Sequence, residues 1–138
     1  MFCLLDTNIL SEMKKADRAA SAVQAWVKTV LEDETFVSVL AVGEIRRGIE
    51  LMRRKDLVAA FSLQRWLDEV IETYAARTLA VTTEVADLWG RLCPTQPLPA
   101  ADGLMAATAL VHDLTLVTRN TRDFERSGVR LLNPFSTP

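Results

Sequence analysis

The sequence lacks most of the residues on which common enzyme chemistries depend. It has one histidine, His112, and two cysteines, Cys3 and Cys93, which stand far apart. A single histidine excludes paired-imidazole catalysis and the HExxH zinc site, and no GxSxG segment is present to build a serine triad with it. The cysteines form neither a disulfide framework nor a zinc pattern, so both are expected to be small buried side chains. The phosphate-binding motifs GxGxxG and GxxxxGK[ST] are absent as well.

Long apolar runs and an excess of positive charge are also missing. No uncharged stretch approaches the roughly 20 residues of a membrane-spanning helix, and Asp6 interrupts the N-terminus before a signal-peptide core could form. We therefore expect a cytoplasmic protein without a membrane segment. The formal net charge of −2 is unlike that of a bulk nucleic-acid binder, which is usually basic. Local fields rather than net charge decide binding, however, so the charge alone does not exclude a nucleic-acid substrate.

What the sequence does contain is a full globular composition and many acids. The 138 residues suit one domain, 1–138, and a hydrophobic share of 49% excludes disorder as the general state. The chain carries 18 aspartates and glutamates. With histidine, cysteine and cofactor motifs set aside, catalysis in this chain would fall to carboxylates.

Hydrophobic periodicity predicts strands that alternate with helices. Short β-rich runs predict strands over residues 2–5, 35–39, 78–81, 114–118 and 129–132. Amphipathic periodicity predicts helices over residues 9–13, 18–32, 40–55, 57–76, 83–92 and 100–112. Three prolines make 93–99 a loop, and 119–126 reads as a polar loop or short helix. This order predicts an α/β fold, with a central parallel sheet of four to five short strands flanked by helices.

Four acids fall near one edge of that predicted sheet. In open parallel sheets, sites form outside the carboxyl ends of the strands, and the acids expected there are Asp6, Glu44, Asp102 and Asp123. Carboxylates that converge repel one another unless a cation lies among them. Mg²⁺ and Mn²⁺ are the ions that carboxylate oxygens and water select. Such an ion can activate water and neutralise charge on a phosphoryl group, which is the chemistry of phosphodiester hydrolysis.

Each acid also has a simpler structural explanation. Asp6 and Asp102 can each cap a helix, Glu44 can pair with Arg47 on the same helix face, and Asp123 can be a solvated loop residue. Considered alone, Glu44 and Asp102 are each better explained by these structural roles than by a functional one. The joint pattern is stronger than any of its members.

Five blocks carry a resemblance that spans essentially the whole chain. They are LDTN at 5–8, SVLAVGEIRRG at 38–48, ADGLMAATA at 101–109, TRNTRDF at 118–124 and LNPF at 132–135. In this order and spacing they resemble the PIN-domain ribonucleases, and within them the VapC/FitB-like toxins of type II toxin–antitoxin systems.

The resemblance implies a metal-dependent ribonuclease. It assigns the metal to Asp6, Glu44 and Asp102, and Asp123 is favoured over Asn120 as the fourth acidic position. The expected substrate-binding residues are Thr7, Asn8, Arg119, Asn120 and Arg122. The implied protein is a Mg²⁺-dependent endoribonuclease, with Mn²⁺ as the alternative ion, that acts on RNA, forms a homodimer and is blocked by a cognate antitoxin.

Two other functions stay open at this point. One is a non-catalytic α/β module that binds RNA or protein through a PIN-like fold. The other is a phosphatase with Asp6 as nucleophile, which is less favoured because Asn8 stands where a second aspartate is expected. The tryptophans Trp26, Trp66 and Trp89 occupy apolar helical positions and are expected in the core or in a dimer contact.

Overall fold

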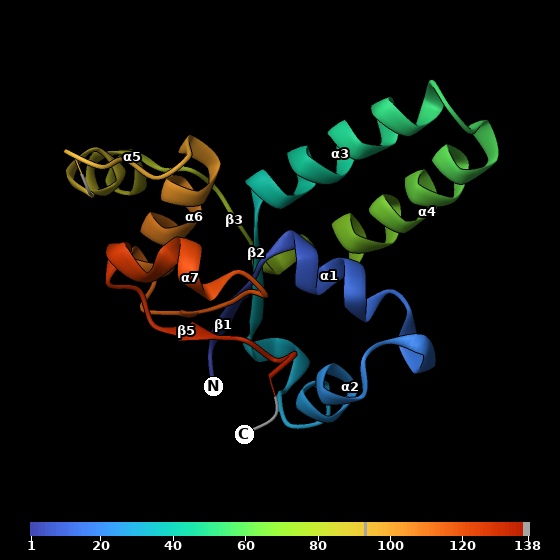
Figure 1. Cartoon of the computed structure of the whole chain (residues 1–138), viewed down its shortest axis with the longest axis horizontal. Coiled ribbons are helices and arrows are strands. Elements are labelled where there is room, and N and C mark those ends of the chain that lie inside the picture. The colour runs from blue at the N-terminus through green and yellow to red at the C-terminus, as the bar shows by residue number, and fades with distance from the viewer. Residues whose placement is uncertain (93, 137–138) are drawn as a thin grey trace.

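The strands form one parallel sheet at the centre of the molecule (Figure 1). The structure is a computed structural model, and it describes residues 1–92 and 94–136; the prediction of a buried Cys93 lies outside these residues. The sheet order is β3-β2-β1-β4-β5, and every neighbouring pair is parallel. The strands are β1 (Cys3–Leu5), β2 (Thr35–Ser38), β3 (Thr78–Leu79), β4 (Thr115–Val117) and β5 (Leu131–Leu132). The predicted α/β fold with a parallel sheet is confirmed.

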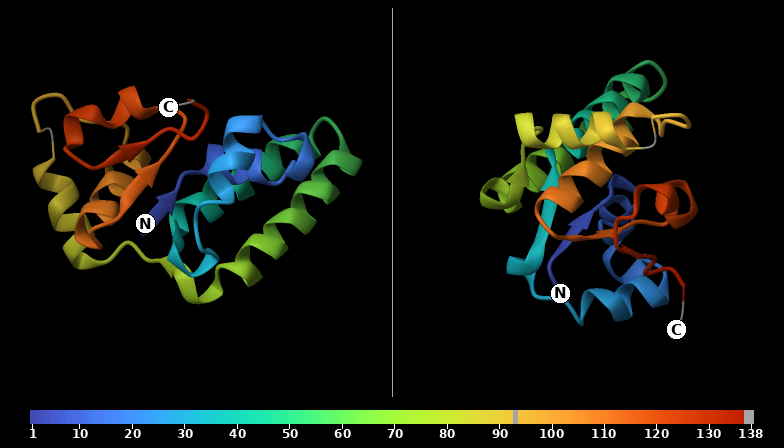
Figure 2. Two further views of the ribbon diagram at one scale, coloured as in Figure 1. Left: turned by 90° about the horizontal axis from the view of Figure 1, so that it is seen from below. Right: turned by 90° about the vertical axis from the view of Figure 1, so that its left-hand side faces the viewer.

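Helices cover both faces of this sheet. They are α1 (Thr7–Met13), α2 (Ser21–Val27), α3 (Val39–Arg53), α4 (Leu57–Thr73), α5 (Thr83–Arg91), α6 (Ala100–Val111) and α7 (Thr121–Phe124). Single 3₁₀ turns lie at Ala16–Arg18, Glu32–Glu34, Ala75–Arg77 and Glu125–Ser127. Figures 1 and 2 show α3 and α4 as a long hairpin on one side and the α5–α6 pair on the other. Among the described residues, no helix is both long and apolar enough to cross a membrane.

The central strand explains how the core is divided. Successive side chains of a strand point to opposite faces, so Cys3 and Leu5 pack with α1, α3 and α4, whereas Leu4 packs with α6 and α7. All three residues are fully buried because helices cover both faces. Burial raises the pKa of the Cys3 thiol to about 11, so it remains a neutral core side chain as predicted.

The helix predicted over residues 18–32 is wrong in its extent. Helix α2 covers only its middle, and a 3₁₀ turn lies at each end of the predicted range. Ala19 and Ala20 are not helical, and the backbone N–H of Ala20 donates to the Glu12 carboxylate at 2.8 Å. Glu12 also accepts from Lys15 Nζ at 2.9 Å. This buried carboxylate holds the chain extended before α2, and apolar periodicity carries no sign of such a bond.

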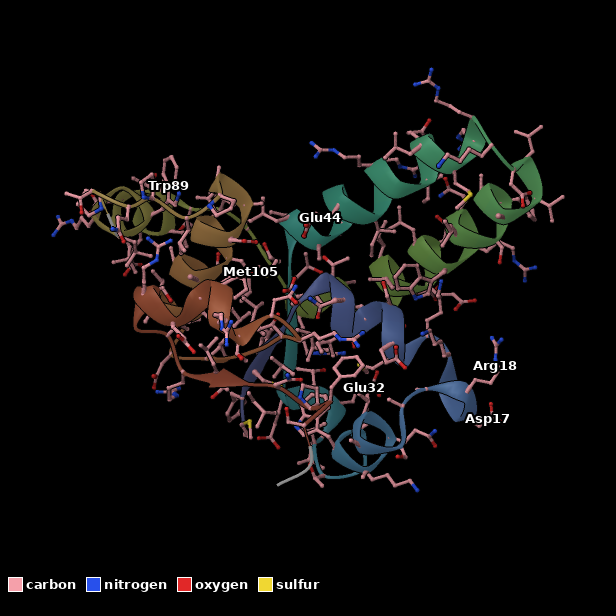
Figure 3. All side chains as sticks on the ribbon, in the orientation of Figure 1. Asp17, Arg18, Glu32, Glu44, Trp89 and Met105 are labelled. Atoms are coloured by element: carbon pink, nitrogen blue, oxygen red, sulfur yellow. The ribbon has the colours of Figure 1, made fainter. Side chains whose placement is uncertain are left out.

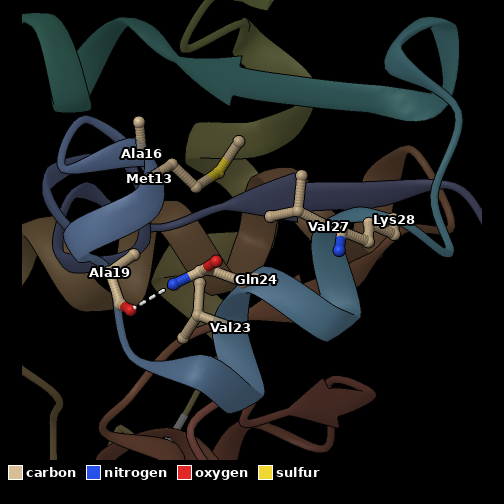
Figure 4. Close-up of a pocket in the computed structure, with 7 residues that line it drawn as sticks. All are labelled: Met13, Ala16, Ala19, Val23, Gln24, Val27 and Lys28. Carbon is tan, nitrogen blue, oxygen red and sulfur yellow. Dashed lines mark hydrogen bonds between the residues drawn. The ribbon is translucent and has the colours of Figure 1, made fainter.

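A hollow of about 250 Å³ lies between α1 and α2 (Figure 4). Gln24 is one of the residues that line it, and its Nε2 donates to the Ala19 carbonyl at 2.7 Å. The side chains that line the hollow are Met13, Ala16, Ala19, Val23, Gln24, Val27 and Lys28. None of the predicted site residues is among them.

Apolar periodicity predicts that Leu67, Val70 and Ile71 of α4 and Val85 and Trp89 of α5 point inward, and two of these five side chains are instead exposed. Leu67 and Val70 of α4 are buried as expected, but Ile71 is 46% exposed. Trp89 of α5 is 40% exposed, although its neighbour in the helical pattern, Val85, is fully buried. Both exceptions stand at the margin of an apolar stripe, where periodicity alone does not decide which side a residue faces.

A candidate carboxylate site at the carboxyl ends of the strands

The edge of the sheet where β1 and β4 end is the topological switch point of the fold. From β1 the sheet continues to β2 and β3 on one side and to β4 and β5 on the other. Asp6 follows β1 directly, and its backbone N–H donates to the Val117 carbonyl of β4 at 2.9 Å. Thr118 follows β4 at the same edge. Ligand sites of open parallel sheets form at such a point.

Asp6 is held through both of its carboxylate oxygens. Oδ1 accepts from the backbone N–H of Thr7 at 2.7 Å, which makes Asp6 the cap of α1. Oδ2 accepts from the Thr118 hydroxyl at 2.8 Å and from Asn8 Nδ2 at 3.3 Å. The cap explanation is therefore correct for one oxygen, while the second is held by Asn8 of α1 and by Thr118, which follows β4.

Thr118 is a residue that the sequence pattern did not single out. It is fully buried, and its hydroxyl oxygen accepts from the backbone N–H of Asn120 at 3.1 Å while donating to Asp6. The available signals were its position at the end of the predicted strand 114–118, at the edge where the acids were expected, and its place at the start of the TRNTRDF block.

Glu44 reaches the same edge from the second turn of α3. Ser38 caps this helix by accepting from the Leu40 N–H at 3.0 Å. Glu44 Oε1 accepts from the Thr7 hydroxyl at 2.9 Å, which links α3 to α1, and Figure 3 shows Glu44 on the part of α3 nearest to α1. In the described part of the chain Glu44 makes no ion pair with Arg47, although this pair was the simpler expectation.

The electrostatics of Glu44 reflect its acidic neighbours. The pKa of Glu44 lies above its ordinary value, and partial burial is the largest cause. The charges of Asp6 and Asp102 also raise this pKa, whereas the hydrogen bond from Thr7 and the charge of Arg47 lower it. Asp6 and Asp102 therefore lie close enough to act on Glu44.

Asp102 is not the cap of its helix, so that explanation is wrong. Helix α6 has Pro99 as its N-cap, and Asp102 is the third residue of the first turn. Burial raises the pKa of Asp102, and the charges of Asp6 and Asp123 raise it further. The structure thus places Asp6 and Asp102 within electrostatic range of Glu44, and Asp6 and Asp123 within electrostatic range of Asp102.

The loop after β4 carries the remaining predicted residues. The backbone N–H of Arg119 donates to Asn8 Oδ1 at 3.1 Å, and its guanidinium lies 4.4 Å from the centroid of the Phe135 ring. Asp123 is exposed in α7, and its N–H donates to the Asn120 carbonyl at 3.0 Å. Arg122 is exposed on the same short helix.

The donor set fits a hard divalent cation, although the carboxylates are not tightly gathered. Within residues 1–92 and 94–136, no three side chains of the types Asp, Glu, His and Cys lie close enough together to enclose a metal ion. Asp6, Glu44 and Asp102 offer only oxygen, the ligand that Mg²⁺ and Mn²⁺ prefer. Mg²⁺ keeps several of its waters when bound, so a wide site with few direct ligands suits it.

Comparison with known proteins identifies the family. Residues 3–129 match the PIN-domain family model, and the chain belongs to this family. It is 32% identical to the VapC ribonuclease Y4jK of Sinorhizobium fredii, over 96% of each chain. It is 29% identical to Toxin FitB of Neisseria gonorrhoeae, over 96% of this chain and 97% of that protein.

A solved structure agrees with these relatives. The crystal structure of FitAcB from Neisseria gonorrhoeae superposes with a TM-score of 0.87 at 30% identity, over 99% of this chain and all of that one. The predicted membership of the PIN-domain family is confirmed. Membership implies the use of a divalent metal ion.

Proposed function

We propose that this chain is an endoribonuclease that hydrolyses RNA phosphodiester bonds with Mg²⁺ and serves as the toxin of a type II toxin–antitoxin pair. The observation that carries the proposal is that, at the switch point of the sheet, the charges of Asp6 and Asp102 act on Glu44 and the charges of Asp6 and Asp123 act on Asp102. The similarity to a VapC ribonuclease and to Toxin FitB over nearly the whole chain supports it.

Three carboxylates would hold the cation, directly or through water. Asp6 and Asp102 are the most direct ligands in this proposal, and Glu44 completes the set. A bound divalent ion would supply activated water and would offset the negative charge that develops on the phosphoryl oxygens. Asp123, which acts electrostatically on Asp102, is the fourth acidic position.

The neighbouring polar side chains orient these carboxylates. The Thr7 hydroxyl fixes one oxygen of Glu44. The Thr118 hydroxyl and the Asn8 amide fix Oδ2 of Asp6. Partners of this kind set the direction of a metal ligand's free lone pairs.

RNA would approach along the loop after β4. Arg119 and Arg122 are the proposed phosphate contacts, because a guanidinium donates to two phosphate oxygens at once. Asn120 lies between them and is proposed to orient the substrate together with Thr7 and Asn8. We further propose that the protein works in the cytoplasm as a homodimer and that a cognate antitoxin blocks this site.

Purified protein incubated with labelled RNA tests the activity directly. Cleavage is expected with Mg²⁺, and it should stop with EDTA and fall by at least about 100-fold in Asp6→Asn. Asp33→Asn is the matched control, because Asp33 is an exposed acid in a 3₁₀ turn away from the carboxylate site. This variant should cleave like the wild type.

Cleavage that does not depend on metal or on Asp6 would contradict the proposed mechanism. If the wild type, the EDTA sample and Asp6→Asn release the same fragments, the carboxylates are not catalytic in this chain. A non-catalytic α/β module that binds RNA or protein would then describe it better.

A further inference from the structure

The first turn of α6 holds Asp102 without help from a capping side chain. Its N-cap is Pro99, and the described residues provide no side-chain bond to the free N–H groups of this turn. The segment that leads into it contains Pro94, Pro97 and Pro99, which have no backbone N–H to donate. Arg126 holds this segment from outside by donating to the carbonyl and side-chain oxygens of Gln96 at 2.7 and 3.1 Å. Because no capping side chain fixes the first turn, what packs against the start of α6 contributes to the position of Asp102.

What packs there is the indole of Trp89. A methyl group built on Gly103 would lie 2.7 Å from Trp89 Cδ1 and 2.8 Å from Nε1, and 3.8 Å from Cβ of Leu98. Real Cβ atoms do not approach other atoms at 2.7 Å, so the indole lies directly against the bare backbone of Gly103. A hollow of about 170 Å³, which Trp89, Leu98 and Gly103 help to line, adjoins this contact. Figure 3 shows Trp89 on α5, the helix that runs beside α6.

We propose that Trp89 is a positioning residue for the Asp102 carboxylate, acting through its contact with Gly103. Gly103 follows Asp102 directly, so any shift that moves the Gly103 backbone away from the indole carries Asp102 with it. A displacement of about 1 Å at a reacting group can cost about 100-fold in rate. The inference rests on the proposed function, because it concerns how one of the proposed metal ligands is placed.

The exposure of Trp89 fits this role better than a role in the core. The side chain is 40% exposed, and a residue that served only to fill the interior would be covered on all sides. Gly103 is buried beneath it, whereas Gly90, beside Trp89 in the same helix, has open space where its side chain would be. The close approach is thus found at Gly103, beside Asp102, and not at Gly43, which precedes Glu44 and has open space where its side chain would be.

A double-mutant cycle with a metal-binding readout tests the proposal. The probe is Mn²⁺, titrated calorimetrically into wild type, Gly103→Ala, Trp89→Leu and the double variant, with the melting temperature of each recorded. Gly103→Ala should weaken Mn²⁺ binding at least about 10-fold, the loss typical of disturbing the support of a metal ligand. It should lower kcat while the KM for RNA stays within about twofold, since the phosphate contacts are untouched.

The double variant supplies the decisive comparison. In the Trp89→Leu background the added methyl has room, so Gly103→Ala should weaken Mn²⁺ binding by less than about threefold there. Trp89→Leu alone should weaken Mn²⁺ binding several-fold, because the first turn of α6 loses its packing partner. If Gly103→Ala does not fold, the Mn²⁺ affinity of Trp89→Leu alone still tests the proposal. Gly90→Ala is the control, and its Mn²⁺ affinity should match that of the wild type.

The outcomes separate this inference from the proposed function. If the wild type neither binds Mn²⁺ nor cleaves RNA, the proposed function fails and the positioning role fails with it. If the wild type does both, but Trp89→Leu and folded Gly103→Ala bind Mn²⁺ as tightly as the wild type, the contact only stabilises the fold and the inference alone is overturned. The inference is overturned in the same way if the two substitutions are coupled in melting temperature but not in Mn²⁺ affinity.

Discussion

At the scale of single residues, Asp6 is both a helix cap and a proposed metal ligand, two roles that the sequence analysis gave as alternatives. One of its oxygens caps α1, while the other is held by Thr118 and Asn8. The first bond is local and could be foreseen from the order Asp6-Thr7. The hydrogen bond from Thr118 to Asp6 joins residues 112 positions apart, and no sequence pattern predicts it. A helix cap and a rigid proposed metal ligand are therefore compatible uses of the same side chain.

The Thr118 hydroxyl leads to a prediction about metal affinity. Thr118→Val keeps the shape of the side chain but removes the donor to Asp6, so Mn²⁺ binding should weaken about 10-fold. The free energy of unfolding should also fall by about 1–3 kcal/mol, because the Asp6 carboxylate loses a buried hydrogen bond and the N–H of Asn120 loses its acceptor. Calorimetric Mn²⁺ titration and urea unfolding measure the two effects. Thr118→Ser keeps the hydroxyl and should bind Mn²⁺ like the wild type, so equal weakening in both variants would contradict the explanation.

Glu12 gives a prediction about pH. Its pKa is lowered by the N–H of Ala20 and by Lys15, with the charge of Arg119 as a smaller cause. A lowered pKa in the folded protein means that ionised Glu12 stabilises the fold above its ordinary pKa of 4.5, and that this stabilisation is lost as the pH falls through the lowered value. Glu12→Gln should therefore melt below the wild type at pH 7, and the gap should close as the pH drops below about 4.

An exposed glutamate is the appropriate control for that series. Glu50 also has a lowered pKa, because of Arg53 and Arg46, but all three side chains are largely solvent-exposed. Exposed pairs contribute little to stability, so Glu50→Gln should melt close to the wild type at every pH. A constant gap between Glu12→Gln and the wild type from about pH 7 to about pH 3 would rule out the ionic explanation for Glu12.

At the scale of the elements, the stability of α3 depends on its N-terminal cap, where strand β2 ends and the helix begins. Its cap, Ser38, is fully buried at the end of β2, and Glu44 stands in the second turn that follows. Ser38→Ala should cost about 1 kcal/mol in the free energy of unfolding, which corresponds to about 3 °C in melting temperature. Ser62→Ala removes the same hydroxyl from an exposed position of α4 and should be neutral or slightly stabilising. Equal losses in both variants would show that the cap is not the cause.

The elements also show where sequence reasoning succeeds and where it stops. The runs that became β1 and β2, and the stripe of Ala41, Ile45 and Ile49 on α3, were foreseeable because burial on a sheet or along a helix imposes a fixed period. The break before α2 was not, because it depends on Glu12 accepting a bond from a backbone eight residues away. Likewise the acids could be assigned to one edge of the sheet, but Thr118 and the contact of Trp89 with Gly103 exist only once β4 and α5 are in place.

At the scale of the whole molecule, the fold gathers negative charge at one edge of the sheet, and within residues 1–92 and 94–136 none of Asp6, Glu44, Asp102 and Asp123 forms an ion pair. Asp6, which follows β1, and Asp102 of α6 act on Glu44 of α3, while Asp6 and Asp123 of α7 act on Asp102. Arg47 is a cation whose charge acts on Glu44. Such an arrangement costs stability when the carboxylates are ionised. A protein of this kind should therefore gain stability from a divalent cation, and the proposed function makes that gain measurable.

Asp102→Asn tests this balance between stability and metal binding. Because burial and the charges of Asp6 and Asp123 raise the pKa of Asp102, the native state disfavours its ionised form, and stability is lost as the pH rises through the raised value. In EDTA the variant should therefore melt above the wild type at about pH 7, and the advantage should shrink toward about pH 4. Added Mn²⁺ at about 100 times its Kd should stabilise the wild type by about 2.7 kcal/mol and the variant by far less. Asp33→Asn should follow the wild type throughout, and an Asp102→Asn protein that gains as much from Mn²⁺ as the wild type would remove Asp102 from the metal site.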